Sequence, residues 1–174
     1  GGEKASRPRA LPDAPAELVG RERILAVATR AFAEVGYEGA TTAQIARDAG
    51  VTQPLVHHHF GSKDGLWRAA MDRVFADVPR FVASGDGDPV AALLGGIEPF
   101  VRFVAARPEA TRIVAREGAT ASPRLDYLVE RHLGEPFREV VALLRAGQRS
   151  GALFDDVRPE LVLFFMLGAG SHLF

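Results

Sequence analysis

The chain has 174 residues, 47% of them hydrophobic, so it is long and apolar enough to bury a core, and a wholly disordered chain is excluded. The formal net charge of −1 does not indicate the strongly basic surface that is typical of nucleic-acid-binding proteins. The absence of cysteine excludes disulfides and thiolate metal sites. The longest unbroken apolar run, Leu161 to Ala169, is shorter than the roughly 18 residues of a membrane span, so we expect no membrane partner.

The first residues, 1–19, are rich in proline, alanine and charge, and we predict a flexible arm. They contain no apolar h-region of a signal peptide, which favours a cytoplasmic location. The charge is almost evenly divided along the chain. Residues 1–75 hold ten basic and nine acidic side chains, a balance that permits a nucleic-acid-binding N-terminal part without requiring one.

Helical periodicity begins after this arm. From about Glu17 to Val35, apolar residues recur at the spacing of one amphipathic helix, which Gly36 ends because glycine adopts the left-handed conformation without a Cβ penalty. A second apolar stripe runs from Leu66 to Val78. It predicts a long helix that Pro79 weakens near its end.

The rest of the chain is predicted to be helical as well. Residues 84–89 have the composition of a loop, and apolar stripes then predict helices from Val90 to Val104, from Pro108 to near Gly118 and over 123–149, with Gly134 and Pro136 straining the middle of the third. A last helix begins near Pro159. No alternating strand of useful length is present, so the fold class is all-α.

The segment between the first two helices contains three closely spaced helix starts. Thr41 is a good N-cap for a helix that starts at Thr42, with Gln44 completing a capping box. Gly50 ends that helix, and either Thr52 or Gln53 caps the next one. The bias of a residue before proline against helical dihedrals favours Gln53. Two short helices around a glycine turn, followed by a long helix after the Ser62 cap, predict a helix-turn-helix.

The second short helix has two distinct faces. Val56 and Phe60 are four residues apart and form the core face, which leaves the opposite side to face solvent or a ligand. Glutamine can pair with adenine, leucine can contact a thymine methyl, and imidazoles can donate to guanine or phosphate, so this side suits the major groove. The exposed set is Gln53, Pro54, Leu55, His57, His58 and His59. Consecutive histidines on a helix point about 100° apart and are poorly placed to chelate one ion, so we expect no metal and no cofactor.

These residues carry a resemblance to a known family. The spacing of Thr41-Thr42, Ile45-Ala46, Ala49-Gly50-Val51, His59-Phe60 and Ser62-Lys63 resembles the DNA-binding domain of the tetracycline-repressor (TetR) family of bacterial transcriptional regulators. The match covers roughly residues 20–67, and the later part is similar only in being helical and of similar length. His57 stands where the family usually has tyrosine.

The resemblance implies a two-part organisation. A helix-turn-helix domain would span 20–67, with a linking helix to about 82, and a ligand-binding and dimerisation domain would span 83–174. Thr42, with the amides at its helix start, and Lys63 would bind phosphates of double-stranded DNA, and Gln53, Pro54, Leu55, His57 and His58 would face bases or adjacent phosphates. Thr41, Thr52 and His59 complete the expected contact set. On a palindromic operator, half-sites would lie about one helical turn apart.

For the second domain, the resemblance implies a homodimer and a small-molecule effector. The helices 123–149 and 159–174 would pair with those of a second copy in a four-helix bundle. A largely apolar effector would occupy a cavity lined by aromatic and apolar residues, with a polar residue to orient it. The candidates are Phe100, Phe103, Phe137 and Met166, with His132 or Arg116 as the polar group. The chain is thus interpreted as a ligand-responsive repressor.

Two other classes of protein remain as alternatives. A helical hairpin could bind protein in place of DNA, which would make the chain an interaction module. A small enzyme is the second alternative, but Ser171-His172 lacks the glycine pattern of a nucleophile elbow, and neither HExxH nor a phosphate-binding glycine loop occurs.

Overall fold

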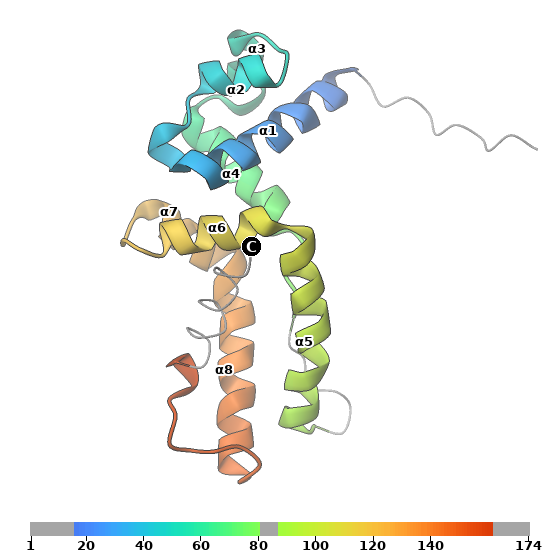
Figure 1. Cartoon of the computed structure of the whole chain (residues 1–174), viewed down its shortest axis with the longest axis vertical. Coiled ribbons are helices and arrows are strands. Elements are labelled where there is room, and N and C mark those ends of the chain that lie inside the picture. Colours follow the sequence, from blue (N-terminus) through green and yellow to red (C-terminus); the bar gives the residue numbers. More distant parts are fainter. Residues whose placement is uncertain (1–15, 81–86, 162–174) are drawn as a thin grey trace, which may run out of the picture.

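The computed structural model describes residues 16–80 and 87–161, and all regular elements in these ranges are helices, which confirms the all-α prediction (Figure 1). Most of the predicted arm, residues 1–19, lies outside the described residues, and α1 begins within it. In chain order the helices are α1 (Ala16–Gly39), α2 (Thr42–Asp48), α3 (Gln53–Phe60), α4 (Lys63–Val74), α5 (Pro89–Ala106), α6 (Pro108–Glu117), α7 (Pro123–Leu128), the π-helix η1 (Val129–Leu133) and α8 (Gly134–Arg149).

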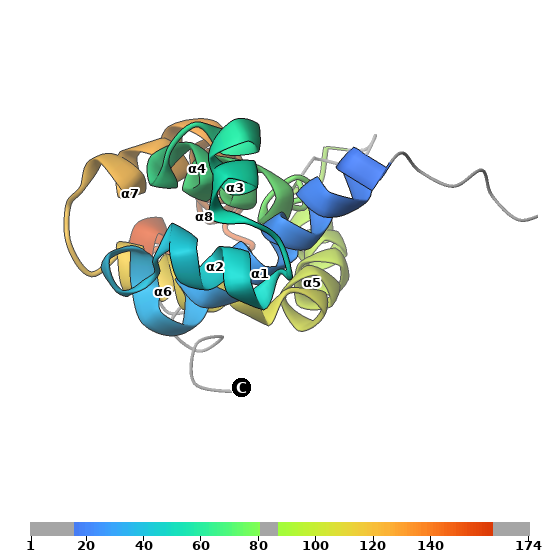
Figure 2. The ribbon, with the colours of Figure 1, turned by 90° about the horizontal axis from the view of Figure 1, so that it is seen from above.

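Helices α1 to α4 form a compact unit, residues 16–75, which we call the head. Helices α1 and α4 pack against each other, and α2 and α3 lie over them at one end of the molecule (Figure 2). The core between them is almost completely removed from solvent, with Ile24, Phe32, Leu66 and Trp67 at most 1% exposed. Burial of this apolar surface is the main stabilising contribution to the head.

Glycine and proline set the ends of the two long helices of the head. Gly36, with φ of 75° and ψ of 176°, interrupts α1 as predicted, and a last helical turn follows to Gly39. Helix α4 ends at Val74, earlier than the predicted stripe to Val78. In a continued helix the ring of Pro79 would clash with the carbonyl of Phe75, four residues earlier, and that carbonyl would also lack a donor.

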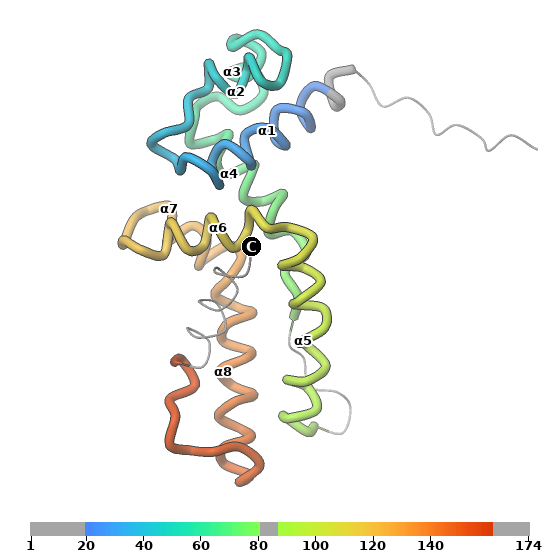
Figure 3. The backbone as a smooth tube through the Cα atoms, in the orientation of Figure 1, coloured from blue at the N-terminus to red at the C-terminus, as the bar shows by residue number. Residues whose placement is uncertain are grey.

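The C-terminal helices, residues 87–161, extend away from the head. Helices α5 and α8 pack against each other along much of their length, while α6 crosses next to the head and packs on α1 (Figure 3). Asp88 caps α5, since its carboxylate accepts a hydrogen bond from the Val90 N–H at 2.9 Å. Helix α6 covers Pro108–Glu117 and is followed by Gly118, as predicted.

The predicted single helix over 123–149 is divided in three. The turn between α7 and α8 is the π-helix η1, in which the Gly134 N–H bonds to the Val129 carbonyl, five residues earlier. Pro136 has no N–H for the His132 carbonyl, and the wider π turn accommodates the proline at the start of α8. A Cβ on Gly134 would lie 2.7 Å from the Val129 oxygen, so this close approach requires glycine.

Only the first residues of the second predicted dimer helix, 159–174, lie within the described part of the chain. A helical turn starts at Pro159, where a helix was predicted, and residues 162–174, including Met166, lie outside the described residues. Helix α5 has 18 residues, of which only Glu98 and Arg102 are charged. By length and composition alone it could cross a membrane. Core helices of soluble proteins pass the same test, so this is weak evidence for a membrane span.

Candidate nucleic-acid interface

Local hydrogen bonds fix the starts of helices α2 and α4 in the head. The Thr41 hydroxyl accepts from the Gln44 N–H at 3.1 Å, and the Ser62 hydroxyl accepts from the Gly65 N–H at 3.0 Å. Each bond satisfies an amide that has no intrahelical partner, which confirms both predicted caps. The side chain of Gln44 does not complete a capping box. It donates to Asp48 at 2.6 Å instead.

Helix α3 starts one residue earlier than the proline rule suggested. Thr52 is the N-cap and Gln53 is the first helical residue, so the choice of Gln53 as the cap was wrong. Pro54 is accepted in the first turn because the amides there have no intrahelical partner, and this outweighs the bias on the residue before it. Gly61, with φ of 72°, ends α3.

The exposed face of α3 is the one that the periodicity predicts. Val56 is 1% exposed and anchors the helix in the core, and Phe60 is partly buried under the Arg21 guanidinium. Gln53, Pro54, His57 and His58 are exposed, and Leu55 is partly exposed next to them. The face that looks away from the head therefore presents an amide, two imidazoles and apolar carbon to whatever binds there.

Neighbouring polar groups hold this face in place. The Gln53 side-chain amide donates to the Thr42 hydroxyl at 3.3 Å and so joins the first residues of α2 and α3. His57 Nδ1 lies 3.3 Å from the Gly61 carbonyl oxygen, which orients the ring toward the end of its own helix. Thr41 and Thr52 are exposed beside them. The structure thus brings the predicted α2 and α3 residues onto one surface.

His59 differs from its two neighbours. Its ring is partly buried, and its Nε2 atom is buried with no hydrogen-bond partner in the described part of the chain. The ring contacts those of His58 and Phe60 at centroid distances of 5.4 and 5.9 Å, so its aromatic face is used in packing. Within the described ranges, no group of three or more His, Asp or Glu side chains is arranged to hold a metal ion.

Lys63, the first residue of α4, is placed by an aromatic ring. Its Nζ lies 4.4 Å from the centroid of Tyr37, and the guanidinium of Arg124 from α7 lies 4.2 Å from the same centroid. Burial, with a smaller effect of Asp64, raises the pKa of Tyr37 above its ordinary value, so the phenol stays neutral and both contacts are cation–π interactions. Sequence patterns gave no signal for this contact between α7 and the head.

The same arginine reaches the end of α6. Arg124 Nε donates to the buried carboxylate of Glu117 at 3.1 Å, and Arg116 donates to the Glu34 carbonyl of α1 at 3.0 Å. Arg116 was expected to orient a ligand. In the structure its guanidinium lies against α1, where its Cδ is 2.9 Å from the position of a Cβ on Gly36.

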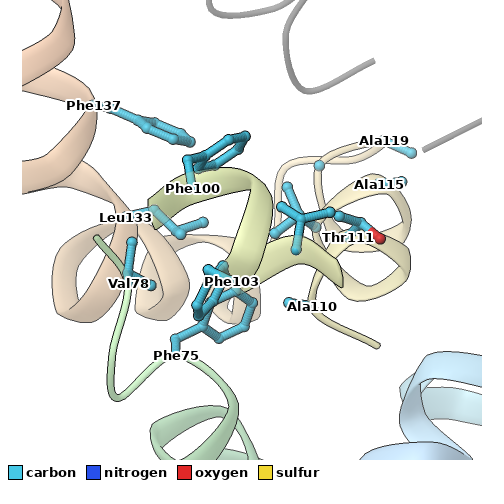
Figure 4. Close-up of a pocket in the computed structure, with 13 residues that line it drawn as sticks. Phe75, Val78, Phe100, Phe103, Ala110, Thr111, Ala115, Ala119, Leu133 and Phe137 are labelled. Carbon is cyan, nitrogen blue, oxygen red and sulfur yellow. The ribbon is translucent and has the colours of Figure 1, made fainter. Parts of the chain in front are cut away.

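An apolar cavity of about 360 Å³ lies next to the head, between the residues that follow α4 and the C-terminal helices (Figure 4). Phe100, Phe103 and Phe137 line it, as expected, while Arg116 and His132 are not among the described lining residues. The full described lining is Phe75, Val78, Phe100, Phe103, Val104, Ala110, Thr111, Val114, Ala115, Gly118, Ala119, Leu133 and Phe137.

His132 instead joins η1 to α4. The carboxylate oxygen Oδ1 of Asp72 accepts from the Tyr127 hydroxyl at 2.8 Å and lies 2.9 Å from His132 Nε2, and we call these three residues the Asp72 cluster. Burial lowers the pKa of His132 below its ordinary value, although Asp72 opposes this shift. Burial and the bond to Asp72 raise the pKa of Tyr127. The cluster thus connects α4 of the head to His132, whose neighbour in the chain, Leu133, lines the cavity.

Comparisons with known proteins agree with this geometry. The family model described as "Bacterial regulatory proteins, tetR family" matches residues 24–70, which are the head without its first helical turns and last residues. The HTH-type transcriptional repressor KstR2 of Rhodococcus jostii is 32% identical over 84% of this chain and 74% of its own length. The transcriptional regulator BetI of Stenotrophomonas maltophilia is 36% identical over 45% of this chain, which spans only 42% of that relative.

Solved structures show the same fold. HlyIIR, a hemolysin II transcriptional regulator, superposes with a TM-score of 0.76 over 86% of this chain and 84% of its own, at 22% identity, a level that supports the fold alone. A tetR family transcription regulator from Shewanella sp. PV-4 superposes with a TM-score of 0.62 at 26% identity over 87% of this chain and 81% of its own. The likeness extends through both the head and the C-terminal helices.

Proposed function

The chain belongs to the TetR family of bacterial regulatory proteins and is a DNA-binding transcriptional regulator, and we propose that it acts as a homodimeric, ligand-responsive repressor. The relatives are transcriptional regulators and not enzymes, so the small-enzyme alternative is set aside. We place its action in the cytoplasm, where the chromosome is. Repression, as opposed to activation, is supported by the name of the relative KstR2.

The exposed face of α3 carries the proposal. Gln53, Leu55 and His58 would contact base edges in the major groove, with Pro54 packing beside them and His57 and Thr52 at the margin. This assignment is supported by the burial of Val56 on one side of α3 and the exposure of Gln53 and His58 on the other. His59 would contribute chiefly by packing, since its Nε2 is buried.

Phosphate contacts would fix the register of the head on the duplex. Lys63 stands at the positive end of the 12-residue helix α4, where backbone amides and the helix dipole favour an anion. Thr41 and Thr42 at the start of α2 would contact the backbone of the same half-site, because the Gln53 side chain bonds Thr42 to the reading face. Such contacts supply affinity without sequence preference.

Dimerisation would place two heads on one palindromic operator. Helix α8, together with the helix that starts at Pro159, would pair with the same helices of a second copy, and residues 83–174 would form the dimerisation and effector domain. An effector in the cavity would press on Phe75, which follows the last residue of α4, and on Leu133 beside the Asp72 cluster. Movement of α4 in both copies would change the spacing of the heads and release the operator.

Selection of genomic fragments by the purified protein, followed by fluorescence anisotropy on the enriched duplex at several salt concentrations, tests the DNA-binding part. We expect a palindromic site bound by two chains. His58→Ala should reduce the ratio of specific to non-specific affinity by roughly tenfold, and Lys63→Ala should weaken all duplexes and lower the salt slope by about one. Binding without sequence preference, or by one chain per site, would contradict the proposal.

A further inference from the structure

The two ends of the cavity differ in chemistry. Figure 4 shows the rings of Phe75, Phe100, Phe103 and Phe137 gathered with Leu133 on one side, while Thr111 and Ala115 of α6 and Ala119 just after it lie on the other. Within the described lining, no side chain is charged, and Thr111 is the one that carries a polar atom. The phenyl side offers no hydrogen-bonding side chain, so within the described lining only Thr111 can bind a polar group of a ligand through its side chain.

Among the described lining residues, the α6 side offers one hydrogen-bonding side chain, and that side chain is left to accept. The Thr111 hydroxyl donates its proton to the Pro108 carbonyl at 3.0 Å, so its oxygen is left to accept. The Gly118 N–H is occupied by the Val114 carbonyl at 2.9 Å, and the Ala119 N–H points to the Arg116 carbonyl at 3.4 Å.

Among the described residues, two arginines near the end of α6 in the chain bind elsewhere. Arg116, in the last turn of α6, donates to the Glu34 carbonyl in the head, and Arg124 pairs with Glu117 and contacts the Tyr37 ring. A carboxylate that entered the cavity would therefore meet neither a cation nor a free hydrogen-bond donor among the side chains of the described lining. An anion without such partners is disfavoured beside the phenyl rings.

We propose that the effector is an uncharged molecule with a hydrocarbon or aromatic body and one hydroxyl or N–H donor directed at Thr111 Oγ1. The cavity volume of about 360 Å³ lies at the lower end of the range of small-molecule sites, so the effector is small. This assignment rests on the proposed function only in calling the ligand an effector, because binding itself requires no DNA.

Three probes with a ten-carbon chain test the donor requirement: 1-decanol, its methyl ether and decanoate. Isothermal titration calorimetry without DNA should give the alcohol an affinity about tenfold above that of the ether, the size expected for one buried hydrogen bond. Decanoate at pH 7.5 should bind more weakly still. Equal binding of alcohol and ether, tighter binding of decanoate, or no binding of any probe would each overturn the assignment.

Variants of one residue separate the hydrogen bond from the shape of the site. Thr111→Val keeps the volume and should reduce the ratio of alcohol to ether affinity to about one, whereas Thr111→Ser should retain it. Thr120→Val, an exposed threonine outside the lining, is the matched control and should leave the ratio unchanged. An unchanged ratio in Thr111→Val would place the donor elsewhere and overturn the assignment.

A parallel measurement keeps the two proposals distinct. If decanol binds with the expected preference while operator affinity stays constant in its presence, the ligand class stands and ligand-controlled repression fails. If decanol does not bind but the operator is still recognised by a dimer, the ligand class fails and the DNA-binding function is untouched.

Discussion

The head and the C-terminal helices are both helical, but they differ in how tightly their side chains are packed. In the head, short helices with hydrogen-bonded caps surround a core whose large side chains, such as Phe32 and Trp67, are almost fully buried. The C-terminal helices leave a cavity of about 360 Å³ and expose large apolar side chains such as Leu94 and Val101. A rigid surface suits the reading of a fixed DNA shape, and a loosely filled interior can respond to a ligand.

The two regions share one buried apolar cluster, which includes Ile113 and Leu128, and polar contacts also join them. The Asp72 cluster joins α4 to α7 and η1, and the contact of Arg124 with Tyr37 joins α7 to the residue beside Lys63. Directional contacts of this kind have discrete arrangements, so they can pass a change in the cavity wall to the head. The comparison predicts that substitutions act differently in the head, in the cavity wall and in the connection.

The largest effect is expected in the core of the head. Trp67→Ala should lower the free energy of unfolding by about 3–5 kcal/mol and abolish specific DNA binding, because a fully packed site cannot collapse around the lost ring. Phe103→Ala in the cavity wall should cost only about 2 kcal/mol, since one side of that ring already faces empty space. Urea denaturation of both variants checks the difference, and equal losses would contradict it.

Backbone geometry at the π turn gives the next effect. Gly134→Ala should cost about 1–3 kcal/mol, because its Cβ would lie 2.7 Å from the Val129 carbonyl oxygen and neither backbone group can move freely. Gly95→Ala on α5 is the matched control. No atom lies within 4 Å of its added Cβ, so alanine should stabilise by up to about 1 kcal/mol. Thermal unfolding monitored by circular dichroism should show shifts of opposite sign.

The sequence allowed the head to be predicted in more detail than the rest, for a physical reason. The caps Thr41 and Ser62 and the break at Gly36 depend on residues within four positions, so local patterns suffice. The face of α3 followed from helical periodicity in the same way. The choice of Gln53 as a cap failed because two local preferences competed at one position.

The C-terminal helices were predicted as helices but not as a site. His132 and Arg116 lie next to apolar stripes, which suggested a place in the cavity, yet each reaches a polar partner on a neighbouring helix, Asp72 or the Glu34 carbonyl. Such partners lie 60 and 82 positions away in the chain, and periodicity carries no information at that range. The π turn was anticipated only as strain at Gly134 and Pro136.

Removal of the Asp72 carboxylate should affect the connection more than either region. Asp72→Ala leaves two partly buried donors without their acceptor, so a loss of about 1–2 kcal/mol in unfolding free energy is expected. Operator affinity of the ligand-free protein should stay within about threefold, while its response to a bound ligand should shrink. Asp77→Ala breaks the exposed ion pair with Arg107 and should change stability by at most about 0.5 kcal/mol. Equal effects of Asp72→Ala and Asp77→Ala on stability and on the response to ligand would show that Asp72 has no specific role in the connection.

The smallest effect is expected from protonation of His132. Because burial lowers its pKa in the folded protein below the ordinary value of 6.5, the unfolded chain binds more protons in the window below pH 6.5. The contribution of this residue to stability is therefore complete above pH 6.5 and decreases as the pH falls toward the folded pKa. Urea denaturation between pH 7.5 and 5 should show this loss, and His132→Gln should have a flatter profile. The Asp72 carboxylate opposes the shift, so a His132 that gained stability on acidification would mean that the attraction to Asp72 outweighs burial, and that the connection is an ion pair.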